Sequence, residues 1–181
     1  EWNLFHVAPP PPHLQPMITA RLRRWAGLAV RLGAGPRMRT IATVCGIGRS
    51  PIAPGTLGSA VGLGISAALA IDPRYQITGC FVAIGLALWS AGPTARALKH
   101  PDPPSIVIDE VAGMMLALAL LPVAWKTYLL AFILFRLLDI LKPPPLRQVQ
   151  RLPGSWGIVL DDLLAGLVTQ VTLRTALSLV R

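Results

Sequence analysis

The sequence of 181 residues is poor in charged residues, in cysteine and in histidine. Only 14% of the residues are charged while 53% are hydrophobic, and the mean hydropathy is +0.58. The two cysteines, Cys45 and Cys80, lie far apart, and the three histidines, His6, His13 and His100, are scattered. This scarcity excludes a disulfide framework, a zinc motif and a histidine-based hydrolase site, unless His100 acts alone. The hydropathy is too high for an ordinary water-soluble domain, so the composition indicates a membrane protein.

Acidic residues are also few. The sequence has eight Asp and Glu and 17 Lys and Arg, which gives a formal net charge of +9. Such a basic balance can indicate a nucleic-acid partner, but nucleic-acid-binding domains are not this apolar. We therefore expect no nucleic-acid partner and take anionic membrane lipid as the acidic partner. The length suits one membrane-embedded unit with a flexible end and no second globular domain, and it leaves the oligomeric state open.

The first 40 residues differ from the rest and are predicted to form a separate segment. Residues 1–16 are rich in proline and lack a hydrophobic period, which predicts disorder. Residues 17–39 carry six arginines, no acid and spaced apolar residues, a pattern typical of a basic interfacial helix on anionic lipid. A secretory or twin-arginine export signal is a less favoured alternative, because the apolar core at residues 25–30 is short. Residues 41–181 are predicted to form the membrane-embedded domain.

Five apolar stretches follow, and they predict an all-α, polytopic transmembrane helical bundle. Several are shorter than the roughly 20 residues that a membrane span needs, so we expect four to five membrane segments, one of them re-entrant or extended by its flanks. Alanine and glycine recur within the stretches, for example at Ala112–Gly113 and Ala165–Gly166, which allows helix backbones to approach closely. The stretches are Thr56–Ile71, Gln76–Ala91, Ile106–Trp125, Thr127–Leu141 and Gly157–Val180.

Lysine and arginine predict the orientation of this bundle. They are concentrated before the first stretch and in the connections 92–105 and 142–156, whereas the alternate connections hold only Arg74 and Lys126. By the positive-inside rule, the amino terminus and these two connections lie in the cytoplasm.

Five of the eight acids lie inside apolar sequence, where a charge is costly and by default indicates function. In the orientation above, two lie about one turn into a helix that enters from the cytoplasm. One lies in the last turn of a returning helix, and two lie near the start of the next helix. All five are therefore predicted to lie at one depth near the cytoplasmic face. They are Asp109, Glu110, Asp139, Asp161 and Asp162.

A cluster of this kind would repel itself unless cations neutralise it, and oxygen-only ligands favour Mg²⁺, Mn²⁺ or Ca²⁺. Arg136, Asp139 and Lys142 follow at i, i+3 and i+6, so they lie close to one helical face. A metal ion beside Arg and Lys suits attack on a phosphate monoester, because both stabilise negative charge on the phosphoryl and leaving oxygens. Two alternatives remain open. Arg136 and Asp139 can form a structural ion pair, and the acids can line a proton or cation path in a transporter.

Two of the acidic segments resemble each other. Ile106–Glu110 is similar to Ile158–Asp162, and each is followed shortly by Ala-Gly. The similarity is either a faint internal repeat or the result of two helices meeting the same packing requirement.

A polar segment, Arg49–Ser59, leads into the first apolar stretch. It contains two prolines and Gly55, and we expect Thr56 or Ser59 to cap the helix that follows. Free backbone N–H groups at such a helix start attract phosphate. The alternative is a simple turn at the entry to the membrane.

Taken together, these segments resemble the phosphatidylglycerophosphatase A family over residues 46–177. Residues 99–104 depart from the family's usual pattern, so His100 and Asp102 receive little weight, and the first 40 residues lie outside the resemblance. The matching patterns are Ser-Pro-x-x-Pro-Gly-Thr-x-Gly-Ser (50–59), Ser-Ile-Val-x-Asp-Glu-x-x-Gly-Met (105–114), Phe-Arg-x-x-Asp-x-x-Lys-Pro-x-Pro (135–145) and Gly-Ile-x-x-Asp-Asp-x-x-Ala-Gly (157–166).

The resemblance implies a Mg²⁺-dependent, multi-pass phosphatase of the bacterial inner membrane that converts phosphatidylglycerophosphate to phosphatidylglycerol and phosphate. Asp109, Asp139 and Asp162 are expected to bind metal. Glu110 or Asp161 is expected to be a further ligand or the base for the attacking water. A small ion transporter or channel and a non-catalytic assembly factor are the alternatives from other classes. The remaining expected site residues are the basic Arg136 and Lys142 and a substrate-binding set, Arg49, Ser50, Thr56 and Ser59.

Overall fold

The computed structural model describes residues 35–144, 146–150, 152 and 154–179, and all the regular structure in these residues is helical. The predicted disordered tail and most of the predicted basic helix at residues 17–39 lie outside the described residues. The predicted all-α class is confirmed for the part that the structure describes. In chain order the elements are α2 (Pro36–Ala42), the 3-10 helix η1 (Ile47–Arg49), α3 (Pro54–Leu69), α4 (Pro73–Leu98), α5 (Ile108–Leu118), α6 (Trp125–Leu141), α7 (Leu146–Val149) and α8 (Ser155–Leu179).

Two helices, α4 and α8, are long and apolar enough to cross a membrane. At 1.5 Å per residue each is nearly 40 Å long, which exceeds the roughly 30 Å of a bilayer's hydrocarbon core. α3 and α6 have 16 and 17 residues, or about 25 Å, and need tilt or flanking residues to cross. The count of four to five spans therefore stays a prediction.

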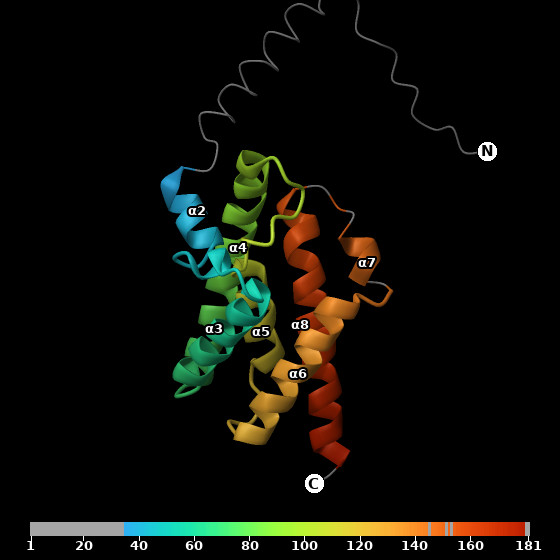
Figure 1. Cartoon of the computed structure of the whole chain (residues 1–181). Coiled ribbons are helices and arrows are strands. Elements are labelled where there is room, and N and C mark those ends of the chain that lie inside the picture. Colours follow the sequence, from blue (N-terminus) through green and yellow to red (C-terminus); the bar gives the residue numbers. More distant parts are fainter. Residues whose placement is uncertain (1–34, 145, 151, 153, 180–181) are drawn as a thin grey trace, which may run out of the picture. The chain divides into compact units, whose positions relative to one another are not determined.

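α5 is the central helix of the bundle, and α8, α3 and α4 pack around it (Figure 1). Most of its residues are buried, among them Val111, Met114 and Leu118. Its 11 residues extend only about 16 Å, too little to cross a bilayer alone. The stretch Ile106–Trp125 has the length of a full span in the sequence, so the short α5 differs from the expectation.

Glycines let the helices around α5 approach its backbone closely. A Cβ atom added to Gly166 of α8 would clash with the carbonyl oxygen of Gly113 in α5, and one added to Gly62 of α3 would meet the carbonyl oxygen of Val111. The close packing predicted from the Ala-Gly pairs is confirmed here. Helices in lipid gain little hydrophobic energy by associating, so such backbone contact supplies much of the packing.

The carboxyl end of α5 is tied to α4 and α8 by side chains. Gln76 Oε1 accepts a hydrogen bond from the N–H of Leu120 at 3.1 Å, Gln170 Nε2 donates to the carbonyl of Ala119 at 2.6 Å, and Arg174 donates to the carbonyl of Leu120 at 3.3 Å. Unpaired backbone groups are costly away from water. These side chains therefore allow α5 to end partway along the bundle.

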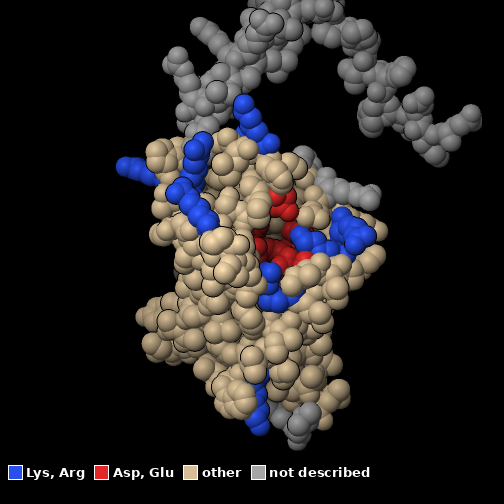
Figure 2. All heavy atoms as spheres, viewed as in Figure 1, with Lys and Arg blue, Asp and Glu red and all other residues tan. Residues whose placement is uncertain are grey.

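The outer surface of the bundle is largely apolar. Phe81 and Trp89 of α4, Ile133 of α6 and Val171 of α8 are exposed. In the face shown in Figure 2 most charged side chains lie in the upper half, a band below them is free of charge, and basic side chains appear again near the lower end. An apolar middle of this kind is suited to contact with lipid rather than water.

Candidate active site

The acids predicted to cluster lie together at the end of the bundle where α5 and α8 begin. They line a cavity of about 160 Å³, which we call the acid pocket, and Figure 2 shows acidic side chains at the base of a hollow with basic side chains beside it. Asp109 and Asp162 are only 5% and 4% exposed. The acid pocket is lined by Asp102, Pro103, Pro104, Ile106, Asp109, Glu110, Asp139, Lys142, Ile158, Asp161 and Asp162.

Three helices bring these acids to one place. Asp109 and Glu110 lie in the first turn of α5, where the positive end of the helix dipole favours an acid. Asp139 lies in the last turn of α6, and Asp161 and Asp162 lie in the second turn of α8. Because α5 and α8 meet at glycines four residues further along each helix, the crossing of the two helices fixes how far apart their acids lie.

Two cations occupy one side of the acid pocket. Arg136 donates a hydrogen bond to Asp139 at 2.5 Å, and Lys142 Nζ contacts Asp161 and lies 3.8 Å from an oxygen of Asp139. Burial of Lys142 lowers its pKa, but its hydrogen bond and ion pair with Asp161 outweigh this, so the pKa is raised above its ordinary range. Lys142 therefore keeps its charge beside the pocket at neutral pH.

Asp109, Glu110 and Asp162 form no ion pair with a cation of the described residues. One carboxylate oxygen from each of Asp109, Glu110 and Asp162 lies within 4.8 Å of the others. Three carboxylates at this separation repel one another strongly unless a cation is shared between them. An oxygen-only donor set of this size fits a hard divalent ion such as Mg²⁺, so these residues could hold one.

Two buried carboxylate oxygens in this pocket have no hydrogen-bond partner among the described residues. They are Oε2 of Glu110 and Oδ1 of Asp161. A buried polar atom without a hydrogen-bond partner lowers the stability of the protein. Such an oxygen is free to bind a ligand or to accept a proton. These are the two residues that the sequence left as alternatives for the base.

The segment 49–59 reaches the acid pocket through only part of its length. Ser59 accepts a hydrogen bond from Arg136 at 3.4 Å, and the missing side chain of Gly55 leaves room for the carboxylate of Glu110 and the guanidinium of Arg136. Arg49 and Ser50 line a different hollow, beside Leu57, and Thr56 does not line the acid pocket.

The expected capping of α3 by Thr56 or Ser59 is wrong. The N-cap residue is Ala53, no side chain caps this helix, and Pro54 occupies its first turn. Proline at the first helical position starts the helix before Thr56. The Ser59 hydroxyl donates to the carbonyl of Gly55 at 2.9 Å instead.

Asp102 lines the acid pocket, although it was not among the expected site residues. It lies in the connection between α4 and α5 and accepts a hydrogen bond from Gln150 at 3.1 Å. Its segment, residues 99–104, departs from the family's usual pattern, and its neighbouring prolines place it outside apolar sequence. The available signal was its position seven residues before Asp109, in the segment that leads directly into the site.

The fold and the pocket define a helical protein, two of whose helices can cross a membrane, with a carboxylate site beside an arginine and a lysine. A sequence model of the family described as Phosphatidylglycerophosphatase A matches residues 40–177, and the chain belongs to this family.

Curated relatives agree with this assignment. The chain is 35% identical over 128 residues to the Phosphatidylglycerophosphatase A of Escherichia coli (strain K12), which covers 68% of this chain and 74% of that protein. It is also 35% identical over 127 residues to the protein of the same name from Haemophilus influenzae, covering 64% of this chain and 73% of that one. A protein of Bacteroides thetaiotaomicron named as a putative phosphatidylinositol-3-phosphatase is 31% identical over 145 residues, 75% of this chain and 91% of that protein. No solved structure matches the chain.

Proposed function

We propose that the protein hydrolyses the terminal phosphomonoester of phosphatidylglycerophosphate, giving phosphatidylglycerol and inorganic phosphate. The observation that carries this proposal is the gathering of five acids, an arginine and a lysine from three helices, within a chain that belongs to the phosphatidylglycerophosphatase A family. The matching family and relatives are phosphatases by name, so the ion-transport alternative has no support from them.

We infer that Asp109, Glu110 and Asp162 hold Mg²⁺, because their oxygens converge and they form no ion pair with a cation of the described residues. When bound, the ion supplies positive charge that polarises the phosphoryl group. The oxygens of Asp139 are engaged by Arg136 and Lys142. We therefore assign Asp139 to holding these two cations in place rather than to binding the metal directly.

The side chains around this triad then have separate tasks. Arg136 and Lys142, fixed by Asp139 and Asp161, balance negative charge on the phosphoryl group and on the departing glycerol oxygen. Glu110 or Asp161, each with a buried oxygen that has no hydrogen-bond partner among the described residues, accepts a proton from the attacking water. The water oxygen bonds to phosphorus as the bond between phosphorus and the glycerol oxygen breaks. The departing oxygen takes up the proton that the carboxylate accepted, and phosphatidylglycerol and phosphate leave.

We propose that the site opens at the cytoplasmic face of the bacterial inner membrane, with several helices embedded in the bilayer. The described basic residues at the end that carries the acids include Arg49, Arg96, Lys99, Lys142 and Arg147, whereas Arg74, Lys126 and Arg174 lie at the other end. The excess of basic residues near the acid pocket favours its placement inside the cell by the positive-inside rule. The acyl chains of the lipid can then stay in the bilayer while its headgroup enters the pocket, which orients the substrate.

The proposal is tested with purified full-length protein in detergent, offered phosphatidylglycerophosphate with and without Mg²⁺. Phosphate release is expected only with the metal, and Asp109→Asn should nearly abolish it while the protein still elutes as a folded species. Activity that survives EDTA or Asp109→Asn counts against the mechanism. Ion flux in proteoliposomes without phosphate release favours a transporter, and indifference to both metal and substitution favours an assembly factor.

A further inference from the structure

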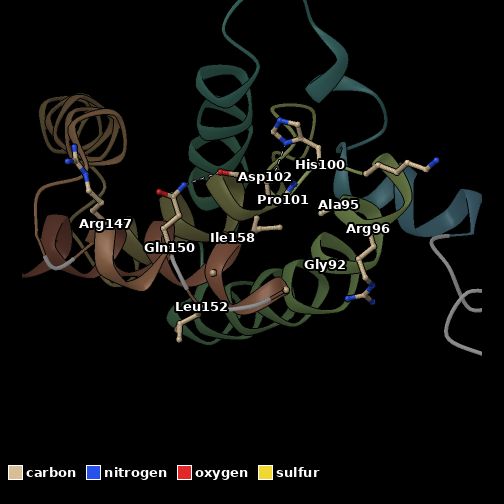
Figure 3. Close-up of a pocket in the computed structure, with 13 residues that line it drawn as sticks. Gly92, Ala95, Arg96, His100, Pro101, Asp102, Arg147, Gln150, Leu152 and Ile158 are labelled. Atoms are coloured by element: carbon tan, nitrogen blue, oxygen red, sulfur yellow. Dashed lines mark hydrogen bonds between the residues drawn. The ribbon is translucent and has the colours of Figure 1, made fainter. Parts of the chain in front are cut away.

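A second, larger cavity adjoins the acid pocket. It has a volume of about 700 Å³ and lies between the carboxyl end of α4, the connection 99–107, α7 and the amino end of α8. The two cavities share Asp102 and Ile158 as lining residues. In Figure 3 the hydrogen bond between Gln150 and Asp102 crosses the middle of the view, between the α4 side and the α7 side of the cavity. We call this space the cationic cavity, because three basic side chains line it.

The side chains that line the two cavities carry net charge of opposite sign. Arg96, Lys99 and Arg147 line the cationic cavity, with Asp102 as the one acid among its lining residues. None of these three cations forms an ion pair within the described residues. In the acid pocket Lys142 stands among six acids. An anion is therefore attracted by the cationic cavity, and is repelled by the acid pocket unless a metal ion accompanies it.

The wall of the cationic cavity is apolar between these charges. Gly92, Ala95, Leu152 and Ile158 lie along it, and Arg96 and Arg147 extend from opposite sides of the view in Figure 3. A cavity with apolar walls and cationic edges suits a ligand that joins carbon atoms to an anionic group. It is less suited to a small ion that would be hydrated on every side.

The position of the cavity along the bundle favours a lipid headgroup. Arg96 lies in the last turn of α4, and α8 begins at Ser155, so the cavity lies where both candidate spanning helices end. Ser155 also joins these two helix ends, because its Oγ accepts a hydrogen bond from the N–H of Gly92 at 2.9 Å. The ends of spanning helices lie at the level of the phosphates of the bilayer, where basic side chains contact them.

We propose that the cationic cavity binds the glycerol and the phosphodiester of the same lipid whose phosphomonoester lies in the acid pocket. This inference rests on the proposed function, because that substrate carries a phosphodiester and a phosphomonoester on the two ends of one glycerol. The phosphomonoester then lies among the acids together with the metal ion, which supplies the positive charge there. The phosphodiester lies beside Arg96 and Arg147. The cationic cavity selects lipids that carry this second phosphate.

The first test measures binding without turnover. Dihexanoyl phosphatidylglycerol, which keeps the phosphodiester and lacks the monoester, is titrated into the purified full-length chain in detergent by calorimetry. Arg96→Gln and Arg147→Gln are each expected to weaken its binding by roughly three- to tenfold, and the double variant by more, as for loss of a partly exposed charge-assisted contact. Arg74→Gln, an exposed arginine at the opposite end of α4, is the matched control and should bind like the wild type. Equal affinity in the wild type and all four variants overturns the inference.

The second test separates the two phosphates during turnover. In the arginine variants the KM for phosphatidylglycerophosphate should rise with little change in kcat, and inhibition by phosphatidylglycerol should weaken. Inhibition by inorganic phosphate, which reports on the acid pocket, should stay as in the wild type. If inhibition by inorganic phosphate weakens instead and that by phosphatidylglycerol does not, the cavity holds free phosphate and the inference is wrong.

The two tests also distinguish this inference from the proposed function. A wild-type protein that releases no phosphate rejects the proposed function, whereas its binding of phosphatidylglycerol still reports on the cavity. A wild-type protein that is active, together with arginine variants of unchanged KM and unchanged phosphatidylglycerol affinity, rejects only the role of the cavity.

Discussion

α5 and α8 carry the same short pattern, Asp-x-x-Ala-Gly, at 109–113 and at 162–166. In both helices the aspartate lines the acid pocket and the glycine, one turn later, lies at the point where the two backbones meet. The structure thus pairs Asp109 with Asp162, one residue away from the pairing with Asp161 that the sequence similarity indicated. The contact between the glycines favours a shared packing requirement as the origin of the similarity.

The second acid of each pair shows how the two helices differ. Glu110 follows its aspartate and joins the group that could hold a metal, whereas Asp161 precedes its aspartate and contacts Lys142. Successive residues of a helix are turned by about 100° from each other. A second acid before or after the first therefore meets a different neighbour, and two similar helices supply different parts of one site.

The largest expected effect comes from the paired aspartates. Asp109→Asn and Asp162→Asn should each lower phosphate release by at least roughly a hundredfold, because each removes a negative oxygen from the proposed metal site. Initial rates over a series of Mg²⁺ concentrations measure this. If one variant keeps the wild-type rate and Mg²⁺ dependence, the two aspartates are not equivalent.

Substitutions of the second acids, Glu110 and Asp161, should differ in their effects on the Mg²⁺ dependence and on the rate. Glu110→Gln is expected to raise the Mg²⁺ concentration needed for half-maximal activity by roughly ten- to a hundredfold. Asp161→Asn should leave that concentration near the wild-type value and lower the rate by at least about tenfold, since Lys142 loses its partner and one of the two candidate bases is removed.

A double variant checks this assignment. If Asp161 works only by holding Lys142, the combination of Asp161→Asn with Lys142→Gln should be no worse than Lys142→Gln alone. Additive losses would show that Asp161 acts on the substrate or the metal by itself.

The crossing of α5 and α8 is tested by adding one methyl group. Gly166→Ala places a Cβ against the carbonyl of Gly113 and should cost about 1–3 kcal/mol of stability, together with activity. Gly85→Ala on α4, where a Cβ meets nothing within 4 Å, is the matched control and should be neutral or slightly stabilising. Thermal unfolding in one detergent compares them, and equal Tm values would contradict close packing at the crossing.

The smallest expected effect concerns the far end of α5, which depends on α8 for a hydrogen bond. Gln170→Leu leaves the carbonyl of Ala119 without its donor and should cost about 1 kcal/mol. Gln148→Leu, at an exposed position of α7, is the control. A Gln170 variant as stable as this control would show that α5 ends without help from its longer neighbour.

Much of the fold could be predicted from the pattern of apolar residues. Each of the five apolar stretches overlaps a helix, because a largely apolar run can bury its backbone polar groups only by pairing them internally. The length of α5 could not be predicted, since Leu120, Leu121 and Pro122 continue the apolar run after the helix ends. The start of α3 was missed for a local reason, the proline at its first position.

By itself the sequence determined which acids lie in costly positions and that they share one end of the bundle, because helix direction and the cost of a buried charge depend on each segment alone. Only the tertiary structure decided which acids face one another and which face Arg136 and Lys142. It also placed Asp102 between two cavities of opposite charge. Those neighbours depend on where helices cross, and the crossing is set by backbone contacts at glycines more than 50 positions apart, which no local pattern specifies.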